Sequence, residues 1–154
     1  MRTPLFLLLL CLVQLPAYAT CWDKAGQRYG IEPELLHAIA IVESNLQASA
    51  RNQNRDGSYD IGLMQINSRH LPRLRQFQIS ERKLLNDPCL SVMTGAWILA
   101  GFMRSYGYSW DAVGAYNAGG APAREHLRQR YILRVQPHYA RLKGNNRPQA
   151  SQKS

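Results

Sequence analysis

The chain has 154 residues, 45% of them hydrophobic, and a formal net charge of +9 at pH 7. This length allows one compact domain with a hydrophobic core and leaves no room for a second domain. The positive charge favours an anionic partner, but the arginines form no nucleic-acid recognition motif, and this argues against nucleic-acid binding. A basic, solvent-exposed face without any partner is the other explanation of this charge.

The first 19 residues have the pattern of a secretory signal peptide. Arg2 gives a minimal positive region, residues 5–13 are apolar, and residues 17–19 provide a small-residue cleavage site. An uncleaved membrane anchor is the alternative, but the apolar run is much shorter than the roughly 20 residues needed to cross a bilayer. We therefore expect an exported, periplasmic protein with no stable membrane insertion.

Three cysteines are present, and cleavage of the predicted signal peptide removes Cys11. The remaining pair, Cys21 and Cys89, would lie in an oxidising compartment, where we expect them to form one disulfide. It would stabilise the fold by roughly 4 kcal/mol, because it lowers the entropy of the unfolded chain. Zinc binding is the alternative, but two distant thiols without a Cys-x-x-Cys motif or a histidine pair are a poor zinc site. We expect no metal and no cofactor.

Residues 21–29 are predicted to form a helix that ends at Gly30, and a second helix is predicted to begin at Pro33 and run to Ser44. In the second helix, apolar residues recur at helical spacing, so that Glu43 lies beside the inward face at the end of the helix. Partial desolvation there would raise the pKa of the Glu43 carboxyl, as a general acid requires. A solvated glutamate at the end of a surface helix is the alternative.

Residues 52–58 are a cluster of turn formers, in which Asp56-Gly57 is a strong hairpin signal. The returning strand would present Asp60 in a wetter, hydrogen-bonded environment, where its carboxylate stays ionised while Glu43 stays protonated. Two carboxyl groups whose pKa values are pushed apart in this way suit glycoside cleavage. A turn or capping role is the alternative for Asp60.

Two helices are predicted in the middle of the chain. Residues 70–77 form a short basic helix, with Leu71 and Leu74 facing inward and the arginines outward, and Asp87 caps a longer helix over residues 88–106. The longer helix is predicted to be the central core helix, because it carries an apolar stripe. The stripe consists of Leu90, Met93, Ala96, Trp97, Ala100 and Met103. An aromatic residue on such a stripe is a core residue more often than a sugar-stacking platform.

The last third of the chain is predicted to hold two more helices. A short helix over residues 110–116 ends at the glycine-containing segment 117–120, and a long helix covers residues 123–142, interrupted or kinked at Pro137. Residues 143–154 are polar and basic and are predicted to form a disordered tail. With one small β-hairpin among these helices, the fold class is α+β and mostly helical.

Several of these segments also resemble known families. The active-site segment of chicken-type lysozymes is similar, nearly residue for residue, to three stretches of this chain: 43–46, 52–60 and 62–69. Together with residues 115–119 and 131–135, these stretches resemble the soluble lytic transglycosylase family, especially its small members encoded with secretion, conjugation and pilus machines. The resemblance covers about residues 21–139 and implies a lysozyme-like fold for a domain over residues 20–142.

This resemblance implies a peptidoglycan lytic transglycosylase that cleaves the β-1,4 bond between N-acetylmuramic acid and N-acetylglucosamine. Glu43 would protonate the leaving oxygen and then, as a carboxylate, deprotonate the C6 hydroxyl, which closes a 1,6-anhydro ring without water. Asp60 departs from the family, whose members generally lack a second catalytic carboxylate; here it is predicted to be catalytic beside Glu43. The late motif would place the Tyr131 hydroxyl near Glu43. The resemblance implies substrate binding by Ser44, Asn54, Met64, Gln65, Tyr116, Asn117 and Tyr131.

Two other functions remain open. The Glu43 and Asp60 pair also suits a hydrolytic, lysozyme-type muramidase, and a non-catalytic wall-binding scaffold is a third hypothesis, which the intact Glu43 disfavours. For Tyr116 and Asn117, a buried tyrosine and a helix-capping asparagine are the alternatives to substrate binding. We expect a monomer that acts on peptidoglycan within a secretion or conjugation machine. The peptide carboxylates of the cell wall would match the positive charge of the chain.

Overall fold

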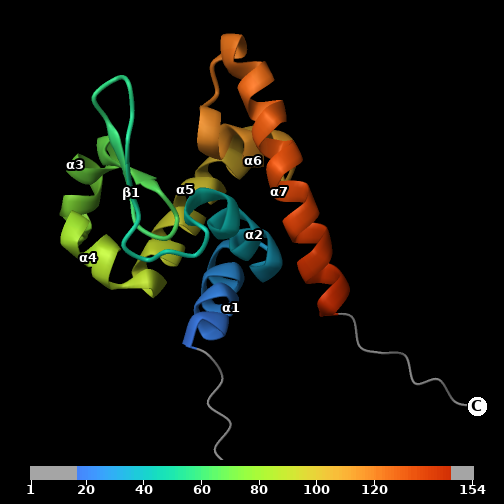
Figure 1. Ribbon diagram of the computed structural model, residues 1–154, viewed down its shortest axis with the longest axis horizontal. Helices are drawn as coiled ribbons and strands as arrows, with labels where there is room; N and C mark the ends of the chain where they lie inside the picture. Colours follow the sequence, from blue (N-terminus) through green and yellow to red (C-terminus); the bar gives the residue numbers. More distant parts are fainter. Residues whose placement is uncertain (1–16, 147–154) are drawn as a thin grey trace, which may run out of the picture.

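The computed structural model describes residues 17–146, which form a mostly helical α+β domain (Figure 1), as the sequence predicts. Most of the predicted signal peptide and of the predicted tail lie outside these residues. The helices are α1 (Ala17–Tyr29), α2 (Pro33–Ser44), α3 (Leu71–Leu74), α4 (Glu81–Asn86), α5 (Pro88–Tyr106), α6 (Trp110–Ala118) and α7 (Glu125–Asn145). The strands are β1 (Arg51–Gln53), β2 (Tyr59–Ile61) and β3 (Ile66–Asn67).

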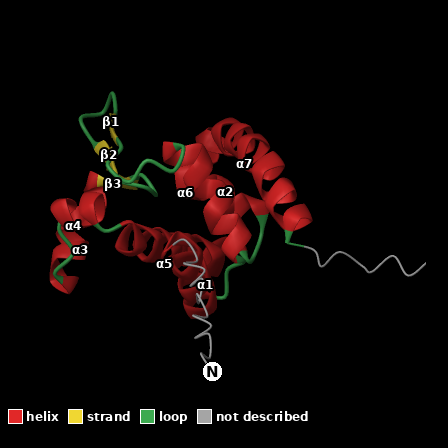
Figure 2. Cartoon of the chain, turned by 60° about the horizontal axis from the view of Figure 1, so that its bottom comes forward, coloured by secondary structure: helices red, strands yellow, loops and turns green. Residues whose placement is uncertain are grey.

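Two groups of elements stand on either side of the long helix α5. Helices α2, α6 and α7 form one group, and the small sheet with α3 and α4 forms the other (Figure 2). Helix α1 packs against both α5 and α2. The candidate site lies in a cleft lined by residues of both groups and of α5.

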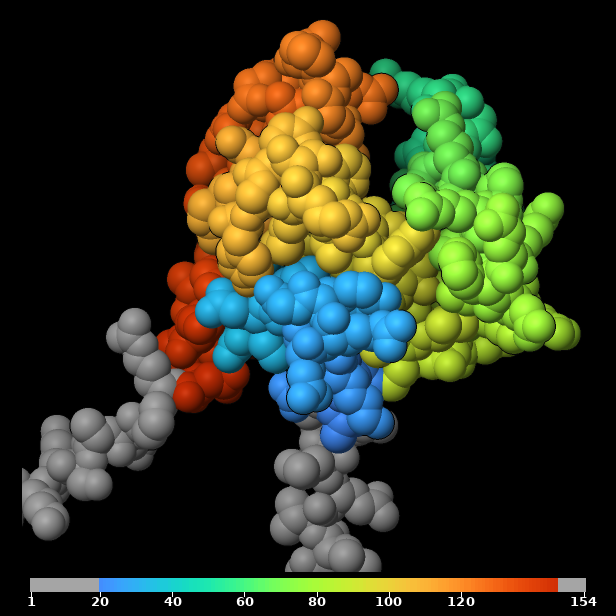
Figure 3. Space-filling model, turned by 180° about the vertical axis from the view of Figure 1, so that it is seen from behind, coloured from blue at the N-terminus to red at the C-terminus, as the bar shows by residue number. Residues whose placement is uncertain are grey.

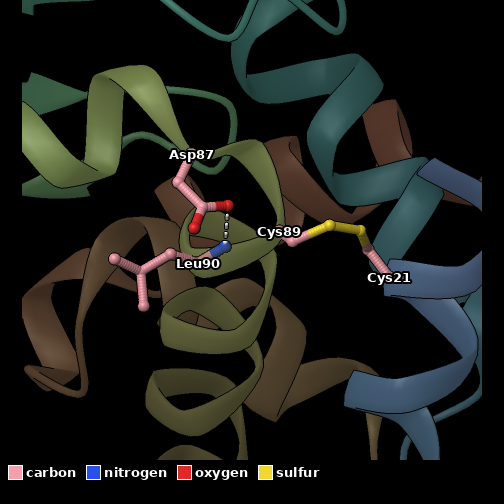
Figure 4. The surroundings of a disulfide bond; sticks show 4 residues. All are labelled: Cys21, Asp87, Cys89 and Leu90. Atoms are coloured by element: carbon pink, nitrogen blue, oxygen red, sulfur yellow. Dashed lines mark hydrogen bonds between the residues drawn. A yellow bond between two sulfur atoms is a disulfide. The ribbon is translucent and has the colours of Figure 1, made fainter. Parts of the chain in front are cut away.

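Helix α5 begins where the sequence predicts. The Asp87 side chain accepts a hydrogen bond from the backbone N–H of Leu90 at 3.0 Å, and Pro88 occupies the first helical position (Figure 4). In the same turn, Cys89 forms a disulfide with Cys21 of α1, with 5.2 Å between the two Cα atoms. The disulfide predicted from the cysteine count is therefore present, and it ties the first described helix to the central one.

The buried face of α5 differs from the predicted stripe. Residues such as Val92, Gly95 and Leu99 are fully buried, whereas Met93 and Trp97 are only half-buried at the edge of the core. A Cβ atom at Gly95 would lie within 3.0 Å of the Met64 side chain, so the absence of a side chain there lets the loop before β3 pack directly on α5. The buried face therefore lies to one side of the predicted stripe, and it mixes large residues such as Leu99 with small ones such as Gly95.

The predicted hairpin is present as strands β1 and β2, whose turn contains Gly57 at φ +82°. A third strand, β3, extends it to an antiparallel three-stranded sheet in which Asp60 on the central strand lies opposite both Asn52 and Asn67. The sequence analysis did not predict β3. A strand of two residues is too short to show an alternating pattern.

The segment after the sheet is helical at residues 68–77, close to the predicted short helix, and its Leu71 and Leu74 are buried. Helix α4, which the sequence analysis missed, follows directly. Its N-cap is Ser80, whose hydroxyl accepts a hydrogen bond from the backbone N–H of Lys83, and Leu84 is its one buried residue. A helix of six residues with a single buried side chain has too little periodicity for a sequence-based prediction.

Two predictions about the last helices need correction. Helix α6 continues to Ala118, so Asn117 lies inside its last turn rather than after the helix. Helix α7 runs without interruption through Pro137 and ends at Asn145 (Figure 1). The predicted tail therefore does not begin at Lys143, whose ammonium group donates to Glu32 at the start of α2 with an N–O distance of 2.6 Å.

Candidate active site

Glu43 lies in the last turn of α2 because of how that helix ends. Asn45 adopts the left-handed conformation, with φ 51° and ψ 39°, and its N–H closes the helix on the carbonyl group of Ile41. The buried residues of α2 include Leu36, Ile39 and Ala40, which fix the helix against the core. Glu43, beside this face, is half-buried and lines a cleft of about 660 Å³.

Burial raises the pKa of the Glu43 carboxyl to about 7. The negative charge of Asp60 adds to this shift, while the hydrogen bond from Tyr131 and the positive charge of Arg134 oppose it. The Tyr131 hydroxyl donates to Glu43 Oε1 at 2.5 Å, and its ring is buried in α7. A carboxyl group with a pKa near neutrality suits a role in which it must both give and take a proton.

The second carboxyl group, Asp60, is held by two asparagine amides. Asn54 Nδ2 donates to Asp60 Oδ2 at 3.0 Å, and Asn67 Nδ2 donates to Oδ1 at 2.8 Å. Both amides also contact the Ser58 hydroxyl at 3.1 Å, and this hydroxyl in turn donates to Asp56 at 2.6 Å. The carboxylate of Asp60 is thus fixed from both sides by the hairpin and by β3.

The cleft separates the two groups of elements described above. In Figure 3 the surface is hollowed between the orange start of α7 and the green hairpin, which belong to opposite walls. One wall comes from the sheet and its turn, the other from the end of α6 and the turn after it, and α5 forms part of the lining between them. The lining includes Glu43, Asn54, Asp60, Asn67, Ile98, Phe102, Tyr116, Asn117 and Arg124. Both predicted catalytic carboxyl groups therefore face one cavity.

The two predicted residues of α6 have different environments. Tyr116 is half-buried and its hydroxyl donates to the backbone carbonyl of Met64 at 2.8 Å, so it joins α6 to the loop before β3. Asn117 is exposed in the cleft and its side chain hydrogen-bonds Glu43, which lowers the pKa of that carboxyl. Tyr116 therefore links the two walls, and Asn117 is placed to contact a ligand.

Three of the predicted substrate-binding residues serve mainly inside the protein. The buried Ser44 hydroxyl donates to the Leu63 carbonyl at 2.7 Å, and Met64 is fully buried. Gln65 reaches the cleft but is 9% exposed, and both ends of its amide are bound, one by Asn52 at 2.6 Å and the other to Gly62 at 2.8 Å. A fourth, Tyr131, is also buried and contacts Glu43 instead. The structure therefore corrects the role of Ser44, Met64 and Tyr131, because a buried side chain cannot touch a glycan.

Two functional residues were missed by the sequence analysis. Asn67 lies inside the family-like stretch 62–69, but its contact with Asp60 depends on the unpredicted strand β3. Arg134 lies on α7, where its guanidinium donates to the backbone carbonyl of Val42 at 3.3 Å and acts on the pKa of Glu43. The sequence offered one signal for Arg134: it follows Tyr131 by three positions, and residues three apart lie on the same face of a helix.

The Transglycosylase SLT domain family matches residues 20–138, most of the described chain. The chain belongs to the SLT transglycosylase family. As a member, this transglycosylase is a lytic enzyme of peptidoglycan, as the resemblance of its motifs predicts.

Two relatives of this transglycosylase match most of its length. Invasion protein IagB of Salmonella typhimurium (strain SL1344) is 54% identical over 128 residues, which are 83% of this chain and 80% of that protein. Protein IpgF of Shigella flexneri is 47% identical over 144 residues, which are 91% of this chain and 95% of that protein. The similarity therefore extends over nearly whole proteins rather than a shared motif.

A solved structure with the same fold is that of an inactive mutant of the lytic transglycosylase Slt from Pseudomonas aeruginosa. The TM-score is 0.65 at 21% identity, with 86% of this chain covered. This transglycosylase spans only a quarter of that protein, 25% of its length. The likeness confirms the lysozyme-like, mostly helical fold. Among residues 17–146, no helix is both long and apolar enough to cross a membrane.

Proposed function

We propose that the chain cleaves the β-1,4 bond between N-acetylmuramic acid and N-acetylglucosamine and releases 1,6-anhydro products, with Glu43 acting first as acid and then as base. The observation that carries this proposal is the position of Glu43 at the cleft, where Tyr131 holds its carboxyl group and burial raises its pKa to about 7. A carboxyl group with this pKa is available in both protonation states at neutral pH.

In the first step, protonated Glu43 donates its proton to the glycosidic oxygen, and N-acetylglucosamine leaves with a free hydroxyl group. Positive charge develops at C1 of the muramic acid residue. Asp60 faces the same cleft, held there by Asn54 and Asn67, so that its negative charge stabilises this state. The fixed carboxylate needs no reorientation during the reaction.

In the second step, the C6 hydroxyl of the same muramic acid residue attacks C1, and its proton passes to the Glu43 carboxylate. This closes the anhydro ring, restores protonated Glu43 and consumes no water. The hydrogen bond from Tyr131 holds Oε1 of Glu43 throughout, so the carboxyl group keeps one orientation in both steps.

A hydrolytic, lysozyme-type reaction is the second candidate. The observation that favours it is the carboxylate of Asp60, held by two amides, since hydrolytic glycosidases use a pair of carboxyl groups at the scissile bond. In that reaction, water rather than the C6 hydroxyl would complete the second step. The products distinguish the two, because hydrolysis leaves a reducing muramic acid and intramolecular attack leaves an anhydro ring.

We also propose that the chain acts in the periplasm as a monomer, after removal of residues 1–19, and opens the wall locally for a secretion or conjugation machine. The disulfide between Cys21 and Cys89 supports an oxidising compartment. The name of the Salmonella relative, an invasion protein, supports service to a cell-envelope apparatus.

The test is mass spectrometry of the muropeptides released from purified peptidoglycan. Wild-type protein is expected to release anhydro-muropeptides, and Glu43→Gln is expected to release none, because it removes the proton donor while nearly preserving shape. Glu34→Gln is the matched control: it makes the same substitution at the other end of α2, where the carboxyl group contacts Asn146 at 2.9 Å. Substantial activity in Glu43→Gln would refute the assignment.

A further inference from the structure

A second, smaller cavity of about 230 Å³ adjoins the catalytic cleft, and we name it the side pocket. His70, Ile98 and Phe102 line both cavities, so the two are continuous across these residues. Its remaining lining residues come from α3 and α5: Arg73, Trp97, Gly101, Arg104 and Ser105. A ligand that occupies the cleft can therefore extend a branch into the side pocket.

The side pocket holds two arginines and no acidic residue. The guanidinium carbon of Arg73 lies 4.7 Å from the centre of the Trp97 ring, and Arg104 Nη2 lies 3.6 Å from the position that a Cβ atom of Gly101 would take. Within residues 17–146, neither guanidinium makes a hydrogen bond or an ion pair. Arg69, by contrast, pairs with Asp56 at 2.9 Å.

The charge of the side pocket comes from these arginines rather than from His70. Burial, with the nearby positive charge of Arg73, lowers the pKa of His70 below its ordinary value, which favours the neutral imidazole. The pocket thus presents two unpaired cations beside the aromatic side chains of Trp97 and Phe102. Guanidinium groups in such a setting favour a carboxylate as ligand.

We propose that the side pocket binds a carboxylate of the peptide stem that the substrate carries on muramic acid. This inference rests on the proposed function, because the glycan must lie in the cleft for its stem to reach Arg73 and Arg104. The volume corresponds to roughly seven to eight liquid waters, enough for a carboxylate and a small apolar group. Alanine methyl groups of the stem would contact Trp97 and Phe102.

The first measurement is binding, made in the inactive Glu43→Gln background so that no substrate is consumed. Co-sedimentation with intact sacculi is compared with co-sedimentation with sacculi whose stems an amidase has removed. Adding Arg73→Gln and Arg104→Gln should weaken binding to intact sacculi about three- to tenfold. The factor is modest because hydrogen bonds to a charged group near the surface are weakened by solvent. Binding to the stripped glycan should not change.

The second measurement is kinetic and uses an active Glu43. The paired glutamine variant should raise KM for intact sacculi by the same factor and leave kcat unchanged, whereas Arg73→Lys with Arg104→Lys should recover most of the loss. Arg82→Gln removes the same charge from exposed α4 and is the matched control. Thermal unfolding of each variant confirms that the fold is intact.

Equal weakening on intact and stripped sacculi would overturn the proposal, since the arginines would then contact the glycan itself. Unchanged binding to intact sacculi would also overturn it. A failure of the proposed function can be told apart from a failure of this inference. In that case the wild-type protein would release no muropeptides, while co-sedimentation of the Glu43→Gln variants would still show what the side pocket binds.

Discussion

Replacement of Glu43 by glutamine should stabilise the fold at neutral and alkaline pH. The folded chain holds the pKa of this carboxyl at about 7, against an ordinary value of 4.5. Glutamine is neutral at every pH and keeps an oxygen that can accept the hydrogen bond from Tyr131. The substitution therefore removes the cost of a buried charge together with the catalytic acid.

The sign and size of the effect follow from the raised pKa. Because the folded state binds the Glu43 proton more tightly than the unfolded state does, this group's contribution is most favourable below about pH 4.5 and is lost as the pH rises to about 7. The difference between the two pKa values corresponds to about 3 kcal/mol in the free energy of unfolding. Above about pH 7 the contribution is constant.

Urea denaturation with the disulfide intact measures this effect. The free energy of unfolding of Glu43→Gln minus that of wild type should increase by about 3 kcal/mol between about pH 4 and about pH 8. Glu34→Gln, a substitution of the same kind at the start of α2, controls for effects at other carboxyl groups. A difference that does not change with pH, or that falls as the pH rises, would show that Glu43 is not a buried acid with a raised pKa.

Three further predictions concern the site and its support. Tyr131→Phe removes a hydrogen bond that lowers the pKa of Glu43, so the alkaline limb of the pH profile of kcat/KM should move to higher pH; a move to lower pH would contradict the assignment. Asp60→Asn should lower kcat by roughly 10² to 10³ with an unchanged thermal midpoint, whereas unchanged turnover would remove Asp60 from the catalytic residues. Replacing Cys21 and Cys89 by serine opens a loop of 68 positions and should lower the free energy of unfolding in urea by about 4 kcal/mol; a loss below about 1 kcal/mol would disagree with the chain-entropy account.

Local sequence signals predicted the elements that carry the chemistry. The apolar spacing after Pro33 placed Glu43 at the end of α2, Asp56-Gly57 predicted the hairpin, and Asp87 before Pro88 predicted the start of α5. Each of these signals acts over a few residues, through side-chain periodicity, a permitted left-handed turn or a cap on free backbone N–H groups. Such interactions depend only on neighbouring residues, so they can be predicted without knowing how distant parts of the chain pack.

Packing between distant segments decided the rest. The buried face of α5 depends on Met64 lying against Gly95, and Asn67 reaches Asp60 only through a strand of two residues. The pKa of Glu43 is set by burial and by groups on other elements, among them the Tyr131 hydroxyl from 88 positions away. Desolvation and cross-chain hydrogen bonds arise only when these elements meet. The sequence by itself therefore determined which residues could do the chemistry, and the tertiary structure decided the environment in which they do it.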